Sequence, residues 1–202
     1  EEEQDHLRHA LEALRLDGSL SVPRSLSALL GERIRRLPDD ERRAVVAAAV
    51  LGSPVDVAVL SAMLDVPLGR VHENVEELVD KELASVLGPV TFGLRTPLLP
   101  AVVLAGLEPD LCVELHLRAA RAYQAVLGAR TEEEAGRIAL HLAEAGERDR
   151  AAGFFATSGL SCLAARRFDR AVGEPGRALD YADVESRSAE ELTEWIAALG
   201  QA

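Results

Sequence analysis

Apolar residues recur at helical spacing along most of the chain. Leu7, Leu11 and Leu14 lie at positions i, i+4 and i+7, which places them on one face of a helix. The same spacing returns after Pro23 and predicts a second amphipathic helix. The apolar face of that second helix is expected to consist of Leu26, Leu29, Leu30, Ile34 and Leu37.

The segment after Pro38 is expected to form the centre of a core. It opens with Asp39, Asp40 and Glu41, which are favoured in a first helical turn by the helix dipole. From residue 44 to residue 51 the segment is apolar on every face. A helix of that kind must be surrounded by other elements.

Two further helices and a hairpin are predicted next. A short helix covers 56–64, and a longer one follows Pro67. Its inward stripe is expected to be Leu68, Val71, Val75, Leu78, Val79 and Leu83. Strands over 84–87 and 90–94 flank Gly88-Pro89, and glycine at the first central position predicts a type II′ turn. Three helices followed by a hairpin form the winged-helix arrangement.

The remainder of the chain reads as helices. They are expected from residue 97 and then over 110–127, 132–145, 148–164, 169–182 and 188–199. The DRAAG segment at residue 149 recurs as DRAVG at residue 169, an offset that fits one helix plus its turn. The predicted fold class is therefore all-α with one small β-hairpin wing: a winged-helix-like bundle followed by helical hairpins.

The last predicted helix carries the candidate interaction site. Ser188 and Glu191 form a capping box at its start. An apolar face at its end includes the only tryptophan of the chain. This face either covers the end of the helical array or binds a protein partner, and its residues are Leu192, Trp195 and Ile196.

Composition narrows the range of functions. Hydrophobic residues make up 48% of the chain but aromatic residues only 3%, which favours closely packed helices of Ala, Val and Leu. The net charge of −12 opposes binding to nucleic acid or to anionic membranes. Cys112 and Cys162 lie in apolar helical stretches, and no stretch is long enough to span a membrane. We expect a cytoplasmic protein with buried thiols.

Several packing motifs resemble a known family. They are Val-Pro-Arg-Ser-Leu (22–26), Leu-Pro-Asp-Asp-Glu-Arg-Arg (37–43), Ala-Ala-Val-Leu-Gly (48–52), Val-Thr-Phe (90–92), Thr-Pro-Leu-Leu (96–99), Leu-His (115–116) and Ala-Leu-His-Leu-Ala-Glu-Ala-Gly-Glu (139–147). Together they resemble the region downstream of the ATPase core in bacterial signal-transduction (STAND-type) ATPases, LuxR-type large ATP-binding regulators and kinase-linked relatives.

The resemblance implies a division of the chain. Residues 1–21 would be a helix at the end of a preceding ATPase lid domain, 22–108 a winged-helix-like domain and 109–202 a tetratricopeptide-like array. The resemblance places core residues of the repeat at Phe155, Gly159, Phe168, Ala171, Ala178 and Leu179. Pro175 departs from this pattern, because proline in a helix interior costs about 3 kcal/mol.

No motif for chemistry was found. The chain has no Gly-x-x-x-x-Gly-Lys sequence to bind phosphates, and its five histidines are scattered and lack metal-ligand spacing. Ser158, Ser161 and Cys162 read as small packing residues. We therefore expect no catalytic residues, no metal and no cofactor.

The helix after Pro67, which is the third of the winged-helix arrangement, argues against sequence-specific DNA binding. Its exposed face is expected to carry two positive and five negative charges, which repel phosphate. The residues of this face are Arg70, Glu73, Asn74, Glu76, Glu77, Asp80, Lys81 and Glu82.

Three functions are left open, in order of preference. The first is a non-catalytic regulatory segment that couples a signal or partner to a neighbouring ATPase domain, with the chain a piece of a larger protein. The second is a stand-alone adaptor that binds a protein through its helical array. The third is a winged-helix DNA-binding domain. For the chain as a whole, the expected partner is a protein or the neighbouring ATPase domain, and no membrane binding is expected.

Overall fold

The computed structural model describes residues 24–128, 134–164, 177, 181 and 197. These residues are mostly helical and include a small three-stranded antiparallel sheet, so the prediction of a helical fold with a small hairpin is confirmed. The helices predicted over 7–14, 169–182 and 188–199 lie outside them, apart from residues 177, 181 and 197. The elements are α2 (Arg24–Arg35), α3 (Asp39–Leu51), β1 (Val55–Asp56), α4 (Val57–Leu64), α5 (Leu68–Asp80), β2 (Ala84–Gly88), β3 (Thr91–Leu94), α6 (Leu98–Ala105), α7 (Pro109–Leu127), α8 (Ala135–Glu144) and α9 (Arg148–Ala164).

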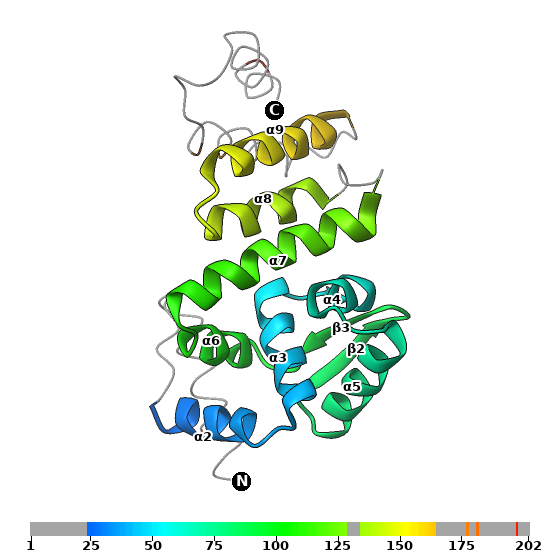
Figure 1. The fold of residues 1–202 in the computed structure, drawn as a ribbon, viewed down its shortest axis with the longest axis vertical. Helices are drawn as coiled ribbons and strands as arrows, with labels where there is room; N and C mark the ends of the chain where they lie inside the picture. Colours follow the sequence, from blue (N-terminus) through cyan, green and yellow to red (C-terminus); the bar gives the residue numbers. More distant parts are fainter. Residues whose placement is uncertain (1–23, 129–133, 165–176, 178–180, 182–196, 198–202) are drawn as a thin grey trace.

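Helix α3 lies at the centre of the first core, as predicted. It contacts α4, α5, α6 and α7, and strand β3 packs on it as well (Figure 1). Ala44, Val45 and Ala47 are completely buried. Small side chains let the neighbouring helices approach α3 on every side. The helix ends at Gly52, whose φ of 74° and ψ of 161° lie in a region that only glycine adopts readily.

The sheet differs from its prediction in two ways. Its strand order is β1-β3-β2, and the two-residue strand β1, in which Val55 pairs with Phe92, was not predicted. The hairpin turn is shifted by one residue, because Gly88 pairs with Thr91 and leaves Pro89 and Val90 at its centre. The type II′ prediction was therefore wrong. Proline fixes φ near −65°, whereas a type II′ turn needs positive φ at its first central position.

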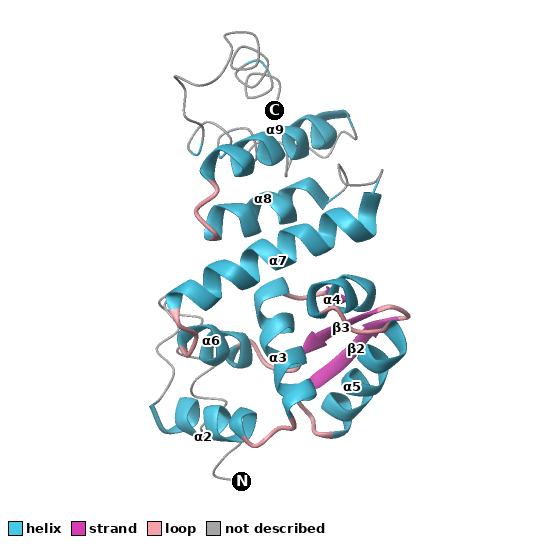
Figure 2. Ribbon diagram, in the orientation of Figure 1, coloured by secondary structure: helices cyan, strands magenta, loops and turns pink. Residues whose placement is uncertain are grey.

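Helix α7 joins the two halves of the described chain. One side of α7 packs on α3 and α4, and the other side packs on α8 (Figure 2). Helices α8 and α9 form an antiparallel hairpin in which the N–H of Gly146 bonds the carbonyl of Ala143 and the N–H of Glu147 bonds that of Leu142. This is a Schellman ending, and its glycine has a φ of 79°. A single cluster of buried residues runs from α2 and α3 through α7 into α9.

Two predicted inward residues are exposed. Leu29 keeps 66% of its surface and Leu68 keeps 45%, so both assignments to an inward stripe were wrong. At about 100° per residue Leu29 lies about 140° around α2 from the buried Ile34, which turns it away from α3 and α6. Leu68 is the first residue of α5 and precedes the part of the helix whose residues are buried.

Replacing Leu60 by alanine should destabilise the protein strongly. This side chain is fully buried on α4, the helix that packs against α7. Losing it should cost about 2–5 kcal/mol of unfolding free energy. Urea unfolding measures the effect. Leu29→Ala is the matched control at an exposed position and should stay within about 0.5 kcal/mol of the parent protein; equal effects of the two variants would contradict the packing described here.

Candidate functional site

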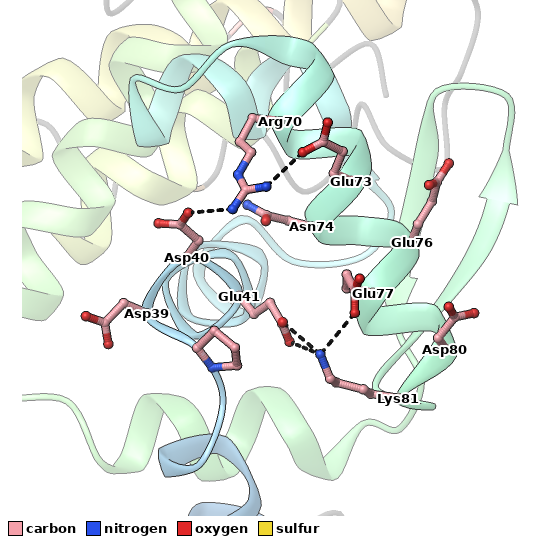
Figure 3. Close-up of a pocket in the computed structure, with 11 residues that line it drawn as sticks. Asp39, Asp40, Glu41, Arg70, Glu73, Asn74, Glu76, Glu77, Asp80 and Lys81 are labelled. Carbon is pink, nitrogen blue, oxygen red and sulfur yellow. Dashed lines mark hydrogen bonds and ion pairs between the residues drawn. The ribbon is translucent and has the colours of Figure 1, made fainter.

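A polar groove of about 790 Å³ lies between the first turn of α3 and helix α5. Seven carboxylates and two cations line it, so it is strongly acidic. Figure 3 shows the side chains of both helices around this space. The lining residues are Pro38, Asp39, Asp40, Glu41, Arg70, Glu73, Asn74, Glu76, Glu77, Asp80 and Lys81.

Two ionic bridges connect α5 to the first turn of α3. Lys81 Nζ lies 2.7 Å from Glu41 Oε1 and 2.8 Å from Glu41 Oε2, and 3.2 Å from Glu77 Oε2. At the other end of the groove Arg70 donates to Asp40 Oδ2 at 3.1 Å and to Glu73 Oε2 at 2.8 Å. The two cations of the groove are therefore already engaged within the chain.

The ion pair between Lys81 and Glu41 includes a buried charge. Only 8% of the Glu41 side chain is exposed, so the carboxylate has lost most of its contact with water. The hydrogen bond to Glu41 raises the pKa of Lys81, and the hydrogen bond to Glu77 raises it further. A raised lysine pKa favours the folded state at all pH values below the ordinary pKa, and the contribution is lost as pH rises through the raised value.

Asn74 lies between the two bridges. It lies on the same side of α5 as Arg70 and the C-cap residue Lys81, at spacings of four and seven residues. Its residue surface is only 5% exposed. Its side chain extends from α5 toward α3 (Figure 3). Among the described residues no side chain or backbone group hydrogen-bonds its amide, and a buried amide without a partner costs about 1–3 kcal/mol.

Asn74 was predicted on the exposed face of this helix, and that prediction was wrong. Asn74 follows Val71 by three residues and precedes Leu78 by four, so it belongs to the buried stripe. A polar residue in the middle of an apolar stripe was the signal that could have identified it. The acidic residues around it are exposed, as predicted, except for the deeply buried Glu41.

A second buried polar cluster lies where α7 meets α8. His116 and His141 bring their Nδ1 atoms to 3.1 Å, and the Tyr123 ring stacks on His141 with centroids 5.7 Å apart. Arg137 donates to the Tyr123 hydroxyl and to the Pro54 carbonyl, both at 3.0 Å. The cluster thus ties α8 to α7 and to the loop after α3.

The histidine pair was not foreseen, because 25 residues separate its members. Each lies on the buried stripe of its own helix, and the stripes meet when α7 and α8 pack side by side. Burial lowers the pKa of His116, and burial together with the charge of the neighbouring His116 and Arg137 lowers the pKa of His141 to about 4. At neutral pH one ring donates a hydrogen bond to the other.

The remaining candidates are distributed as follows. Leu192, Trp195 and Ile196 lie outside the described residues, so the predicted interaction face stays a prediction. Cys162 is buried, but Cys112 is half-exposed, which corrects the prediction of two buried thiols. In the described part of the chain no three His, Cys, Asp or Glu side chains are placed to hold a metal ion. No described helix combines the length and apolar character needed to cross a bilayer.

Comparisons with known proteins assign no family. No protein-family model matches the chain, and neither the curated proteins nor the solved structures searched give a match.

Removing the charge of Lys81 should destabilise the fold through Glu41. Lys81→Met leaves the buried carboxylate without its cation, and such an isolated charge is costly. The urea midpoint should fall clearly, and a Glu41→Gln/Lys81→Met double variant should recover most of the loss. Arg118→Met breaks an exposed pair with Glu114 on α7 and serves as the control, with an expected midpoint close to that of the parent. A Lys81→Met midpoint equal to that of the control would show that Lys81 does not compensate the buried charge of Glu41.

The histidine cluster should make stability depend on pH. The folded pKa of His141 lies below that of the unfolded chain, so the unfolded state binds more protons as pH falls from about 6.5 to 4. Unfolding free energy should fall over this window by up to about 3 kcal/mol. The measurement is the difference between parent and His141→Phe in urea unfolding at several pH values. His72→Gln, at an exposed histidine, should keep the pH slope of the parent; a slope retained in His141→Phe would contradict the assignment.

Proposed function

We propose that this chain is a non-catalytic regulatory and protein-interaction segment of a bacterial signal-transduction ATPase or transcriptional regulator. In this proposal the unit from α2 to α6 is a winged helix. Helices α7 to α9 then begin a tetratricopeptide-like array. The order of α3, α4, α5 and the β2–β3 hairpin supports the first assignment. The α8–α9 hairpin, with Phe155 and Gly159 buried, supports the second.

The observation that carries the proposal is the position of α7. One face of α7 is buried on α3 and α4, and another is buried on α8, within one cluster of apolar side chains. The Arg137 contacts reinforce this junction from the side of α8. A displacement of the helical array would therefore be transmitted to the winged-helix unit, which is what a regulatory coupling segment requires.

The charges favour a protein partner over DNA. The exposed face of α5 is acidic, and its two cations, Arg70 and Lys81, are bound to carboxylates of the same chain. The hairpin presents Val86, Leu87 and Val90 to solvent and has no lysine or arginine at its tip. Such a surface repels phosphate and offers apolar contact area instead.

The coding sequence around this segment tests the ATPase assignment. A phosphate-binding Gly-x-x-x-x-Gly-Lys-Ser/Thr motif is expected upstream of Glu1 in the same reading frame. An upstream sequence that lacks this motif would reject the ATPase assignment. It would favour the stand-alone adaptor, which has the same interaction surfaces.

A titration with duplex DNA tests the interaction-module assignment. At low salt and micromolar protein we expect no complex, because the α5 face repels the phosphate backbone. Fluorescence anisotropy of a labelled duplex measures it. Binding that weakens steeply with added salt would instead establish the DNA-binding alternative.

A further inference from the structure

The groove between α3 and α5 contains one polar group that the fold leaves unused. Asn74 is buried, its amide is without a hydrogen-bond partner among the described residues, and it lines the groove. The bridges from Arg70 to Asp40 and from Lys81 to Glu41 hold α5 against α3 on either side of it. Because α5 already packs against α3, the groove exists before any ligand arrives, which lowers the entropic cost of binding.

The electrostatics of the groove select a cation. Seven carboxylates line it, and its own two cations are taken up by the bridges. Glu76 and Asp80, one helical turn apart on α5, have no cationic partner among the residues that the structure describes. An incoming positive group would gain from this excess charge, and it would regain the hydrogen bond that the Asn74 amide lacks.

Among cations the guanidinium group fits best. It is planar and offers five N–H donors in a fixed fork, so it can donate to an amide oxygen and to a flanking carboxylate together. An ammonium group is more strongly hydrated and directs its donors less well. A bare metal ion is disfavoured by the side-chain geometry, since no ligand cluster is present in the described residues.

The geometry points to an arginine-binding groove: the space between α3 and α5 takes an arginine side chain from a basic segment of a protein partner, with Asn74 Oδ1 as its buried acceptor. This inference rests on the proposed function, and names the partner chemistry for one surface of the interaction module. Asp40 and Glu73, which already bind Arg70 at one end of the groove, lie beside the incoming group and can share their remaining lone pairs with it.

The sequence makes a direct test possible, because Asn74 is the only asparagine among the 202 residues. Labelling with ¹⁵N-asparagine makes the Asn74 side chain the only labelled NH₂ group, which appears in an NMR spectrum as one pair of signals sharing a nitrogen frequency. The probe is a short acetylated and amidated Gly-Ser peptide that carries arginines. Adding it should shift the Asn74 side-chain signal in a saturable manner. The same peptide with lysine should bind more weakly, and the neutral citrulline peptide should leave the signal in place.

A variant separates specific binding from general attraction. Asn74→Leu keeps the branched shape and the number of heavy atoms of the side chain, and replacing an unpartnered buried amide by an apolar group should leave thermal unfolding unchanged or raise its midpoint. Its affinity for the arginine peptide should fall about tenfold or more. Glu108→Gln removes one negative charge from an exposed position outside the groove and should keep the affinity of the parent within about twofold.

Three results would overturn the inference. They are an Asn74 signal that does not move, equal affinities in the parent and Asn74→Leu, or a loss of stability in Asn74→Leu that reveals a structural partner of the amide. None of these would decide against the interaction module itself. The DNA titration and the upstream coding sequence test that proposal independently.

Discussion

The burial of α3 is the constraint on which the rest of the structure depends. From Ala44 to Leu51 this helix is apolar on every face, so four other helices and a strand must enclose it. Its alanines let the neighbouring elements approach closely, and Val45 is fully buried beside them. Because α3 cannot move within this shell, the acidic residues of its first turn are held in place opposite α5. The groove around Asn74 is a consequence of that arrangement.

The same constraint connects the two halves of the described chain. Helix α7 covers one side of α3 and α4, and its other side is the platform for α8 and α9. The contacts of Arg137 with Tyr123 and Pro54 add a polar connection at the edge of this interface. Packed side chains therefore run without interruption from the α8–α9 hairpin through α7 to α3, whose first turn lines the groove.

Much of the fold followed from the spacing of apolar residues. The bounds of α9 agree with the prediction, and those of α4 and α7 are within one residue of it. The apolar patterns of these three helices are either long or bounded by proline and glycine.

The wrong predictions have physical causes. Strand β1 has only two residues and carries no periodic pattern, and Leu29 belongs to a helix too short for sequence to tell which side will be covered.

The site was less accessible to sequence reasoning. The acidic character of the groove could be predicted from the sequence of α5 and of the first turn of α3. The burial of Asn74 and Glu41 depends instead on how α3 and α5 pack against each other. The pairing of His116 with His141 likewise depends on the register of α7 against α8. Such contacts join residues far apart in the chain, and periodicity reports only the face on which each residue lies.

Hydrogen exchange of backbone amides under native conditions tests most directly whether α3 and the helices α7 to α9 form one cooperative body. If they do, the slowest amides of α3, α7 and α8 exchange with the same free energy of opening, and Leu60→Ala lowers all three by the same amount. If α8 and α9 instead open at a much lower free energy that Leu60→Ala leaves unchanged, the two halves are independent. The coupling role assigned to α7 would then be contradicted.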